Sequence, residues 1–233
     1  MPWSYPAILA YHRVGRFKND HVPTVSVQAF EAQLHWLRRW RVRVAPFEAL
    51  AETLAAGRSI ERGVTAITFD DGYEETYTNA WPLLKRFGFP STVFVTPGEV
   101  GLPGFATWTQ VREMAVDGVT IGNHTMHHTY LPLAKDEALT EELVDSKRII
   151  EEQTGRPVRL MSYPIGGYTP RAQEIVRGAG YLAACTTNRG QRRGMDLFAI
   201  RRIKINDPDA NPLLLAAKLS GYYDVFRRLR QPG

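Results

Sequence analysis

The chain has 233 residues, of which 44% are apolar and 23% are charged, and its formal net charge is +5. This length allows one large domain with a full hydrophobic core. The single cysteine, Cys185, excludes an intrachain disulfide and gives no support for an oxidising compartment; no apolar run approaches the roughly 20 residues that span a bilayer.

The N-terminal segment MPWSYPAILAYHRV lacks the basic start and the long apolar stretch of a signal peptide, so we interpret it as part of the fold. We therefore expect a cytoplasmic protein. Any membrane contact is expected to be peripheral. Nothing in the sequence specifies an oligomeric state.

Arginine-rich segments occur at residues 37–43, 191–193, 201–202 and 226–231. They suit an anionic partner, such as a phosphorylated sugar carrier or a membrane surface, or they form a solvated basic surface. The spacing that marks the known nucleic-acid-binding modules does not occur, so we expect no nucleic-acid partner.

Short segments rich in β-branched residues predict eight strands, at 7–12, 41–46, 64–69, 91–96, 118–124, 159–164, 180–186 and 198–205. Helical patterns lie between them, at 27–40, 47–57, 73–88, 107–118, 136–155 and 169–180. This alternation favours a parallel sheet, wound into a barrel or open and doubly wound.

We expect one domain over residues 1–233, because no linker, repeat or low-complexity segment divides the chain. A basic amphipathic helix is predicted at about 209–230. It docks on the barrel or lies on a membrane interface, and we favour docking.

The segment ITFDDGY places two neighbouring carboxylates, Asp70 and Asp71, at the end of an apolar strand. In an α/β barrel, the carboxyl ends of the strands form the active-site face. Two adjacent carboxylates repel each other, which favours protonation of one of them unless a cation or an arginine is near. A solvated Asp-Asp-Gly turn is the alternative interpretation.

The segment GVTIGNHTMHHTYL carries three histidines, His124, His127 and His128, after another predicted strand. His124 and His128 are four residues apart, so one helical turn would bring both imidazoles to one side; His124 with His127 is the alternative pair. Two histidines and one carboxylate form a familiar catalytic zinc site with a coordination position left for water.

Together and in this order, the two motifs resemble those of the polysaccharide deacetylase family, the carbohydrate esterases with a NodB-homology domain. The first motif corresponds to Thr68–Gly72 and the second to His124–His128. The resemblance extends over nearly the whole chain and includes PSTVFVTPGEVG, SYPIGGYTP and GAGYLAACTTNRG. It implies an α/β fold in which about seven to eight parallel strands form a single-domain distorted (β/α) barrel.

By this resemblance, Asp71, His124 and His128 hold a divalent metal, and Asp70 is the general base. His127 is a neighbour within the motif and not a ligand. Zinc is the expected metal, although cobalt, nickel or iron would fit the same ligands.

The third family motif corresponds to Ser162–Gly166. The backbone N–H of Ile165 would point at the oxyanion of the tetrahedral intermediate. We assign substrate contacts to Tyr163, Pro164 and Tyr168. Tyr73, Trp108 and Tyr130 are further aromatic candidates for stacking on a sugar ring.

The sequence departs from the family pattern at Ser162, where many members have an arginine that pairs with the base. Arg202, in the segment DLFAIRRIKI, matches another family arginine and is the candidate replacement. Arg201 is the alternative. An arginine beside Asp70 would keep this carboxylate ionised.

Many family members have a late histidine that acts as the general acid, but this sequence has no histidine after His128. Some members are circularly permuted and carry that histidine early, in a Y-H-x-V pattern. Tyr11-His12-Arg13-Val14 matches this pattern, so we expect His12 to protonate the leaving amine.

The resemblance therefore implies a metal-dependent hydrolase that removes an N-acetyl group from an amino sugar in a poly- or oligosaccharide, or in a nucleotide- or lipid-linked precursor. Deacylation of another amide or of an O-acetyl ester is one alternative. A silent carbohydrate-binding module is another, but such a module would need no base–acid pair.

Overall fold

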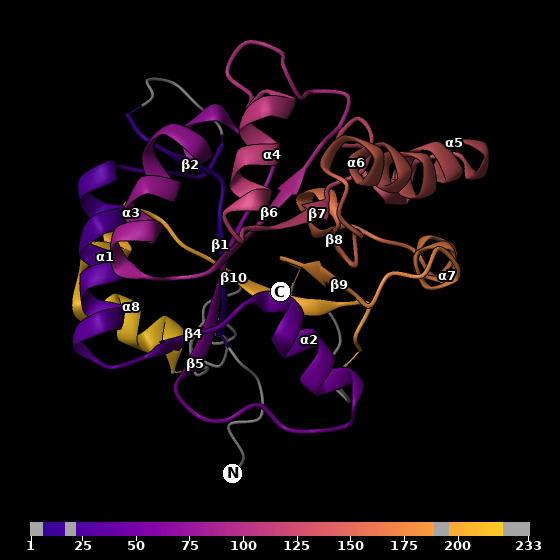
Figure 1. The fold of residues 1–233 in the computed structure, drawn as a ribbon. Helices are drawn as coiled ribbons and strands as arrows, with labels where there is room; N and C mark the ends of the chain where they lie inside the picture. Colours follow the sequence, from indigo (N-terminus) through magenta and orange to yellow (C-terminus); the bar gives the residue numbers. More distant parts are fainter. Residues whose placement is uncertain (1–6, 17–21, 189–195, 221–233) are drawn as a thin grey trace, which may run out of the picture.

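The computed structural model describes residues 7–16, 22–188 and 196–220 (Figure 1). All eight predicted strands are present in one parallel sheet. They are β1 (Ala7–Tyr11), β4 (Arg43–Val44), β5 (Val64–Phe69), β6 (Ser91–Val95), β7 (Thr120–Asn123), β8 (Leu160–Ser162), β9 (Ala183–Thr186) and β10 (Ile200–Lys204).

The sheet closes into a barrel through its first strand. β1 pairs with β10 on one side and with β5 on the other, so seven strands form a ring, and β4 pairs with the start of β5 as an additional strand. Of the two predicted arrangements, the barrel is confirmed and the open, doubly wound sheet is not. A second, two-stranded sheet of β2 (Arg13–Val14) and β3 (Thr24–Val25) was not predicted.

Helices surround the ring (Figure 1). They are α1 (Val27–Arg39), α2 (Phe47–Ala55), α3 (Trp81–Phe87), α4 (Trp108–Val116), α5 (Asp136–Thr140), α6 (Ser146–Thr154), α7 (Pro170–Gly178) and α8 (Pro212–Leu219). Single 3-10 turns occur at η2 (Leu131–Leu133), η4 (Pro164–Gly166) and η5 (Asp207–Ala210).

Two of the predicted helices contain π-helical turns. Turn η1 (Thr76–Ala80) precedes α3, and turn η3 (Glu141–Asp145) joins α5 to α6 within the predicted helix at 136–155. Each π turn accommodates one additional residue, which changes the side chains that a helix directs toward the sheet. Residue periodicity alone predicts the helices but not these turns.

The barrel interior is apolar at one end. An inner cluster joins strand residues to α2, whose Phe47 ring lies 6.4 Å from the Phe94 ring. On β7, a Cβ at Gly122 would lie 2.5 Å from the Phe94 ring, so glycine is required there. This end is thereby closed by α2 and filled by side chains.

Toward the carboxyl ends of the strands, the inward positions become polar. Because side chains alternate along a strand, residues two positions apart face the same side. Ala66 of the inner cluster is thus followed by Thr68 and Asp70, and Ile200 is followed by Arg202. A dry apolar base therefore supports a polar site at the other end of the barrel.

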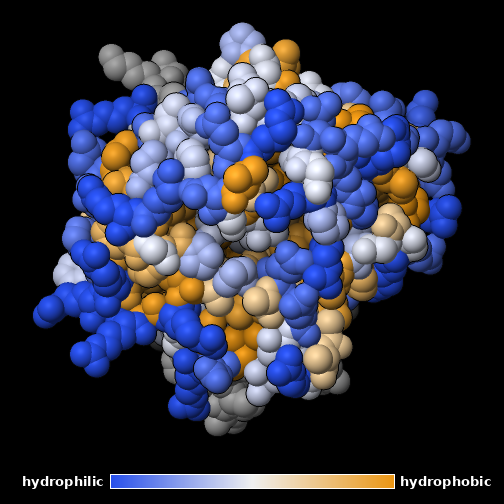
Figure 2. Space-filling model, viewed as in Figure 1, coloured by the Kyte–Doolittle hydropathy of each residue, from blue (hydrophilic) through white to orange (hydrophobic). Residues whose placement is uncertain are grey.

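A second, larger cluster packs the outward faces of the strands against the helices. Hydrophilic side chains cover most of the face seen in Figure 2, with apolar patches between them. No helix within the described ranges is both long and apolar enough to span a membrane.

The described part of the predicted C-terminal helix ends with α8. Lys218 of α8 is buried and donates hydrogen bonds to the backbone oxygen of Lys204 and to Asp209, each at 2.7 Å. α8 is thus attached to the end of β10. The rest of the predicted helix, the start of the N-terminal segment and the arginines at 191–193 and 226–231 lie outside the described residues.

Candidate active site

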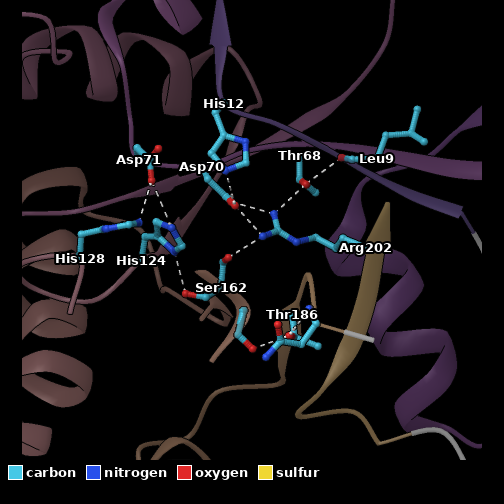
Figure 3. A network of polar contacts seen from close by, with 12 residues as sticks. Leu9, His12, Thr68, Asp70, Asp71, His124, His128, Ser162, Thr186 and Arg202 are labelled. Carbon is cyan, nitrogen blue, oxygen red and sulfur yellow. Dashed lines mark hydrogen bonds and ion pairs between the residues drawn. The ribbon is translucent and has the colours of Figure 1, made fainter. Parts of the chain in front are cut away.

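Polar side chains from several strand ends meet at the carboxyl end of the barrel (Figure 3). His12 follows β1, Asp70 and Asp71 follow β5, His124 follows β7, and Arg202 belongs to β10. These strands are far apart in sequence but belong to one closed ring. Barrel closure therefore assembles the site.

Asp70 forms a buried ion pair with Arg202. Arg202 Nη1 donates to Oδ1 at 2.7 Å and Nη2 donates to Oδ2 at 2.6 Å. Burial opposes ionisation of Asp70, but the charge of Arg202, its hydrogen bonds and the nearby imidazoles together outweigh burial and hold the pKa of this carboxyl below its usual value. Asp70 is thus a carboxylate fixed in one orientation.

The departure at Ser162 has a structural explanation. Arg202 Nη1 also donates to Thr68 Oγ1 at 3.0 Å, and Nη2 donates to Ser162 Oγ at 2.7 Å. Ser162 thus accepts a hydrogen bond from the arginine that reaches Asp70 from β10. Of the two arginines considered, Arg202 makes this pair.

Asp71, His124 and His128 form a group whose ligand atoms all lie within 4.8 Å of one another. Asp71 Oδ1 lies 3.2 Å from His124 Nε2 and 3.3 Å from His128 Nε2. His124 is buried, and His128 is half-buried and faces the pocket. The three expected ligands thus converge on one point (Figure 3).

This donor set fits a divalent cation. His124 Nδ1 lies 2.7 Å from the backbone oxygen of Ser162 and donates to it, which leaves Nε2 as the ring atom that faces Asp71. Asp71 Oδ1 is buried without a hydrogen-bond donor among the described residues. A cation between these atoms would satisfy both the carboxylate oxygen and the imidazole lone pair.

Strained backbone concentrates at the site. Four of the five described non-glycine residues with positive φ belong to its loops: Asp71 (70°), Thr125 (67°), His128 (55°) and Ile165 (57°). Such conformations persist only where surrounding contacts enforce them, and they cluster at functional sites.

His12 lies beside Asp70. Its Nε2 is 3.9 Å from Asp70 Oδ2, and its buried Nδ1 has no partner among the described residues. Burial lowers the pKa of the imidazole, while the nearby charges of Asp70 and Asp71 oppose this shift. His12 and Asp70 thus face the same pocket.

A pocket of about 330 Å³ is lined by His12, Asp70, Asp71, His124 and His128, whereas Arg202 is not part of its described wall. Its walls also include Tyr73, Tyr163 and Ile165 among the predicted residues. Trp108, Tyr130, Pro164 and Tyr168 are not part of the described pocket wall; the Tyr168 ring stacks on Tyr163 at 4.9 Å between centroids.

Several pocket residues were missed by the sequence analysis: Val22, Pro23, Glu99, Phe105, Thr187 and Lys204. Phe105 stacks on Tyr73 with 5.0 Å between ring centroids. Burial raises the pKa of Glu99. Alternation along β10 would have identified Lys204, because it lies two residues beyond Arg202.

Glu142 was also missed, although it contacts the loop between His124 and His128. Its carboxylate accepts hydrogen bonds from the backbone N–H groups of Met126 and His127. Burial opposes ionisation of Glu142, but hydrogen bonds led by that from Thr129 outweigh it and lower its pKa. His127 Nδ1 lies 3.1 Å from Glu142 Oε1, which places this imidazole against Glu142.

The family model for polysaccharide deacetylases matches residues 57–184, more than half of the chain. The chain belongs to the polysaccharide deacetylase family, a family of hydrolases. Its matched segment contains both aspartates and all three histidines of the second motif.

Individual relatives agree with this assignment. The chain is 28% identical over 200 residues to YxkH of Bacillus subtilis (strain 168), which is named as a polysaccharide deacetylase; the match covers 85% of this chain and 71% of YxkH. It is 25% identical over 199 residues to a poly-β-1,6-N-acetyl-D-glucosamine N-deacetylase of Staphylococcus aureus (strain MRSA252), covering 74% and 68% of the two chains.

A solved structure has the same barrel. The Streptococcus pyogenes deacetylase PplD, described in complex with acetate, matches with a TM-score of 0.84 and 26% identity. The match covers 94% of this chain and 99% of PplD. The expected fold of the family is thereby confirmed.

Proposed function

We propose that this protein is a metal-dependent hydrolase that removes the N-acetyl group from an amino sugar and releases acetate. The observation that carries the proposal is the pair of adjacent carboxylates with different surroundings. Asp70 is fixed by Arg202, whereas Asp71 Oδ1 faces two imidazole nitrogens without a hydrogen-bond donor. One carboxylate is thus available as a base and the other as a ligand.

Asp71, His124 and His128 would hold the metal. Zinc suits two imidazoles and one carboxylate, and cobalt, nickel or iron would fit the same atoms. When bound, a divalent cation supplies Lewis acidity, which makes water more acidic and polarises the acetyl carbonyl.

Asp70 would accept a proton from the attacking water as the oxygen adds to the acetyl carbon. Arg202 donates one hydrogen bond to each carboxylate oxygen and so fixes the orientation in which the base acts. The backbone N–H of Ile165 would stabilise the negative charge that develops on the former carbonyl oxygen. The position of Ile165 in the pocket wall, with a φ of 57°, supports this role.

His12 would donate a proton to the nitrogen as the carbon–nitrogen bond breaks, leaving acetate and a free amine. Amines are poor leaving groups without a proton donor. The 3.9 Å between His12 Nε2 and Asp70 Oδ2 supports return of the proton from Asp70 to His12 as the cycle closes. The position of β1 between β10 and β5 supports the circularly permuted arrangement.

The proposed substrate class is based on the names of similar proteins. The similar S. aureus protein is named for N-deacetylation of a β-1,6-linked N-acetylglucosamine polymer, and PplD is described with acetate. We extend this to an acetylated amino sugar in a polymer, an oligomer or a nucleotide- or lipid-linked precursor. The stacked Tyr73 and Phe105 supply an apolar wall for a sugar ring, whereas Tyr168 would act through Tyr163.

A substrate panel tests this proposal. Metal-loaded protein is incubated with N-acetylglucosamine oligomers, a nucleotide-linked N-acetylglucosamine and an O-acetylated sugar, and released acetate is measured. We expect acetate from at least one N-acetylated substrate, with a free amine formed in equal amount. Acetate from the ester alone would overturn N-deacetylation, and no acetate from metal-loaded protein would overturn the proposed activity.

A further inference from the structure

The loop that carries both histidine ligands has a strained backbone. It connects β7 to η2, and two of its non-glycine residues, Thr125 and His128, have positive φ angles of 67° and 55°. His128, a metal ligand in the proposed function, is itself one of them. A loop of this kind keeps its shape only when groups outside it hold it.

Glu142 makes four hydrogen bonds to this loop. Oε2 accepts from the backbone N–H groups of Met126 at 2.9 Å and His127 at 3.1 Å. Oε1 accepts from Thr129 Oγ1 at 2.6 Å and lies 3.1 Å from His127 Nδ1. The residue is only 4% exposed. Both carboxylate oxygens are thus occupied by the three residues that flank His128.

The same helical turn also holds the start of the loop. Ser146 Oγ donates to the backbone oxygen of Glu142 at 2.6 Å and accepts from Asn123 Nδ2 at 2.7 Å. Asn123 is the last residue of β7 and directly precedes His124. The segment from Glu142 to Ser146 therefore contacts residues before His124 and on both sides of His128.

The π turn explains how one helix reaches both ends of the loop. Glu142 lies in η3, between α5 and α6. A π turn is costly in a regular helix and frequently marks a functional site. Here its extra residue brings the Glu142 carboxylate under the loop while Leu143 remains in the core.

We propose that Glu142 is a positioning residue for the metal site: its carboxylate holds residues 126–129 so that His124 and His128 face Asp71. This inference rests on the proposed metal-binding role of those three residues. Groups that orient metal ligands from behind typically contribute 10- to 100-fold in metal affinity.

The test is metal binding by Glu142→Gln in the full chain. Glutamine keeps the shape but removes the charge that all four hydrogen bonds share. Its amide nitrogen would face the N–H groups of Met126 and His127 at the Oε2 position, so it must take the Oε1 position, where Thr129 Oγ1 and His127 Nδ1 would have to accept instead of donate. Cobalt(II) affinity is measured by competition with a chelator, and the visible absorption of bound cobalt reports its coordination geometry. We expect the dissociation constant to rise by about 10- to 100-fold, with an altered cobalt spectrum.

Glu141→Gln is the matched control, because Glu141 is the exposed neighbour in the same turn. It should bind cobalt like the wild type. An unchanged affinity and spectrum in Glu142→Gln would overturn the proposal, even if its melting temperature falls, because a merely structural role would act on folding alone.

Thr129→Val provides a second variant should Glu142→Gln fail to fold. It removes one hydrogen bond to Oε1 and should weaken cobalt binding by a smaller factor in the same direction; no change would overturn the proposal. A wild-type protein that binds no cobalt would overturn the metal site itself, and with it this role. This result can be told apart from an unchanged Glu142→Gln variant, because it is seen in the wild-type protein. Both results are independent of acetate release, because cobalt binding is measured without substrate.

Discussion

Arg202 and Asp70 form a two-bond ion pair in which both carboxylate oxygens are held, at 2.7 and 2.6 Å, with no water-exposed surface on the guanidinium side chain. The same guanidinium contacts Thr68 and Ser162, on two other strands. Arg202 therefore fixes the orientation of the proposed base and links three strands of the barrel.

Replacing Arg202 with lysine should lower kcat/KM by at least about tenfold. A lysine ammonium cannot give two parallel hydrogen bonds and also reach Thr68 and Ser162. Metal content should stay at the wild-type level, because the hydrogen bonds of Arg202 go to Thr68, Asp70 and Ser162 and not to the expected ligands. The matched control is Arg201→Lys, one residue away on the other face of β10. Equal losses in the two variants would contradict the role of Arg202.

The two adjacent aspartates should respond differently to the same substitution. Asp71→Asn should lose metal, because a neutral amide is a poor ligand at a site with two imidazoles. Asp70→Asn should retain metal and lose turnover by about 10²- to 10⁴-fold, the usual contribution of a general base. Elemental analysis after dialysis and acetate release from the same samples measure both. Loss of metal from Asp70→Asn alone would reverse the assignment.

His12→Gln should retain metal and release acetate about 100-fold more slowly from an N-acetyl sugar, because the amine would leave without its proton donor. The defect should be much smaller with 4-nitrophenyl acetate, whose leaving group needs no proton. A His12→Gln variant that hydrolyses the amide like the wild type would exclude His12 as the acid. An equal defect on both substrates would instead indicate a role in binding or in activating water.

Glu142 should also contribute to acid sensitivity. Because its pKa is lowered in the folded protein, its stabilising effect is fully present above the unfolded value of about 4.5 and is lost as the pH falls through the folded value. The difference in free energy of unfolding between wild type and Glu142→Gln should therefore be largest near neutral pH and should narrow below about pH 4.5. Urea unfolding of the metal-stripped proteins measures it. A gap that widens on acidification would contradict this sign.

The sequence was sufficient for much of the fold because its signals are local. Buried parallel strands such as AILAY and VTAITF are continuous apolar runs, and all their residues are buried. The helix predicted from residue 107 onward contains α4, whose N-cap Thr107 forms a capping box with Gln110. The β2–β3 pair was missed because two-residue strands have no periodicity to detect.

The site was predictable where a motif fixes the chemistry, as for Asp71, His124 and His128, which lie together. It was less predictable where the contact depends on folding. In the sequence, Ser162 stands where many family members have an arginine. In the structure, its hydroxyl accepts a hydrogen bond from Arg202, a residue 40 positions away in the chain. Glu142 resembles any other acidic residue of a helix until η3 places it beneath the histidine loop. No local pattern could reveal either contact.

The most direct test of the account is acetate release from N-acetylglucosamine oligomers by one preparation of wild-type protein, measured after metal removal and again after zinc or cobalt is restored. We predict little or no acetate from the stripped protein and recovery of turnover when one equivalent of metal is added, because Asp71, His124 and His128 supply one cation site. Equal rates with and without metal would contradict the central claim that these three residues hold a catalytic cation.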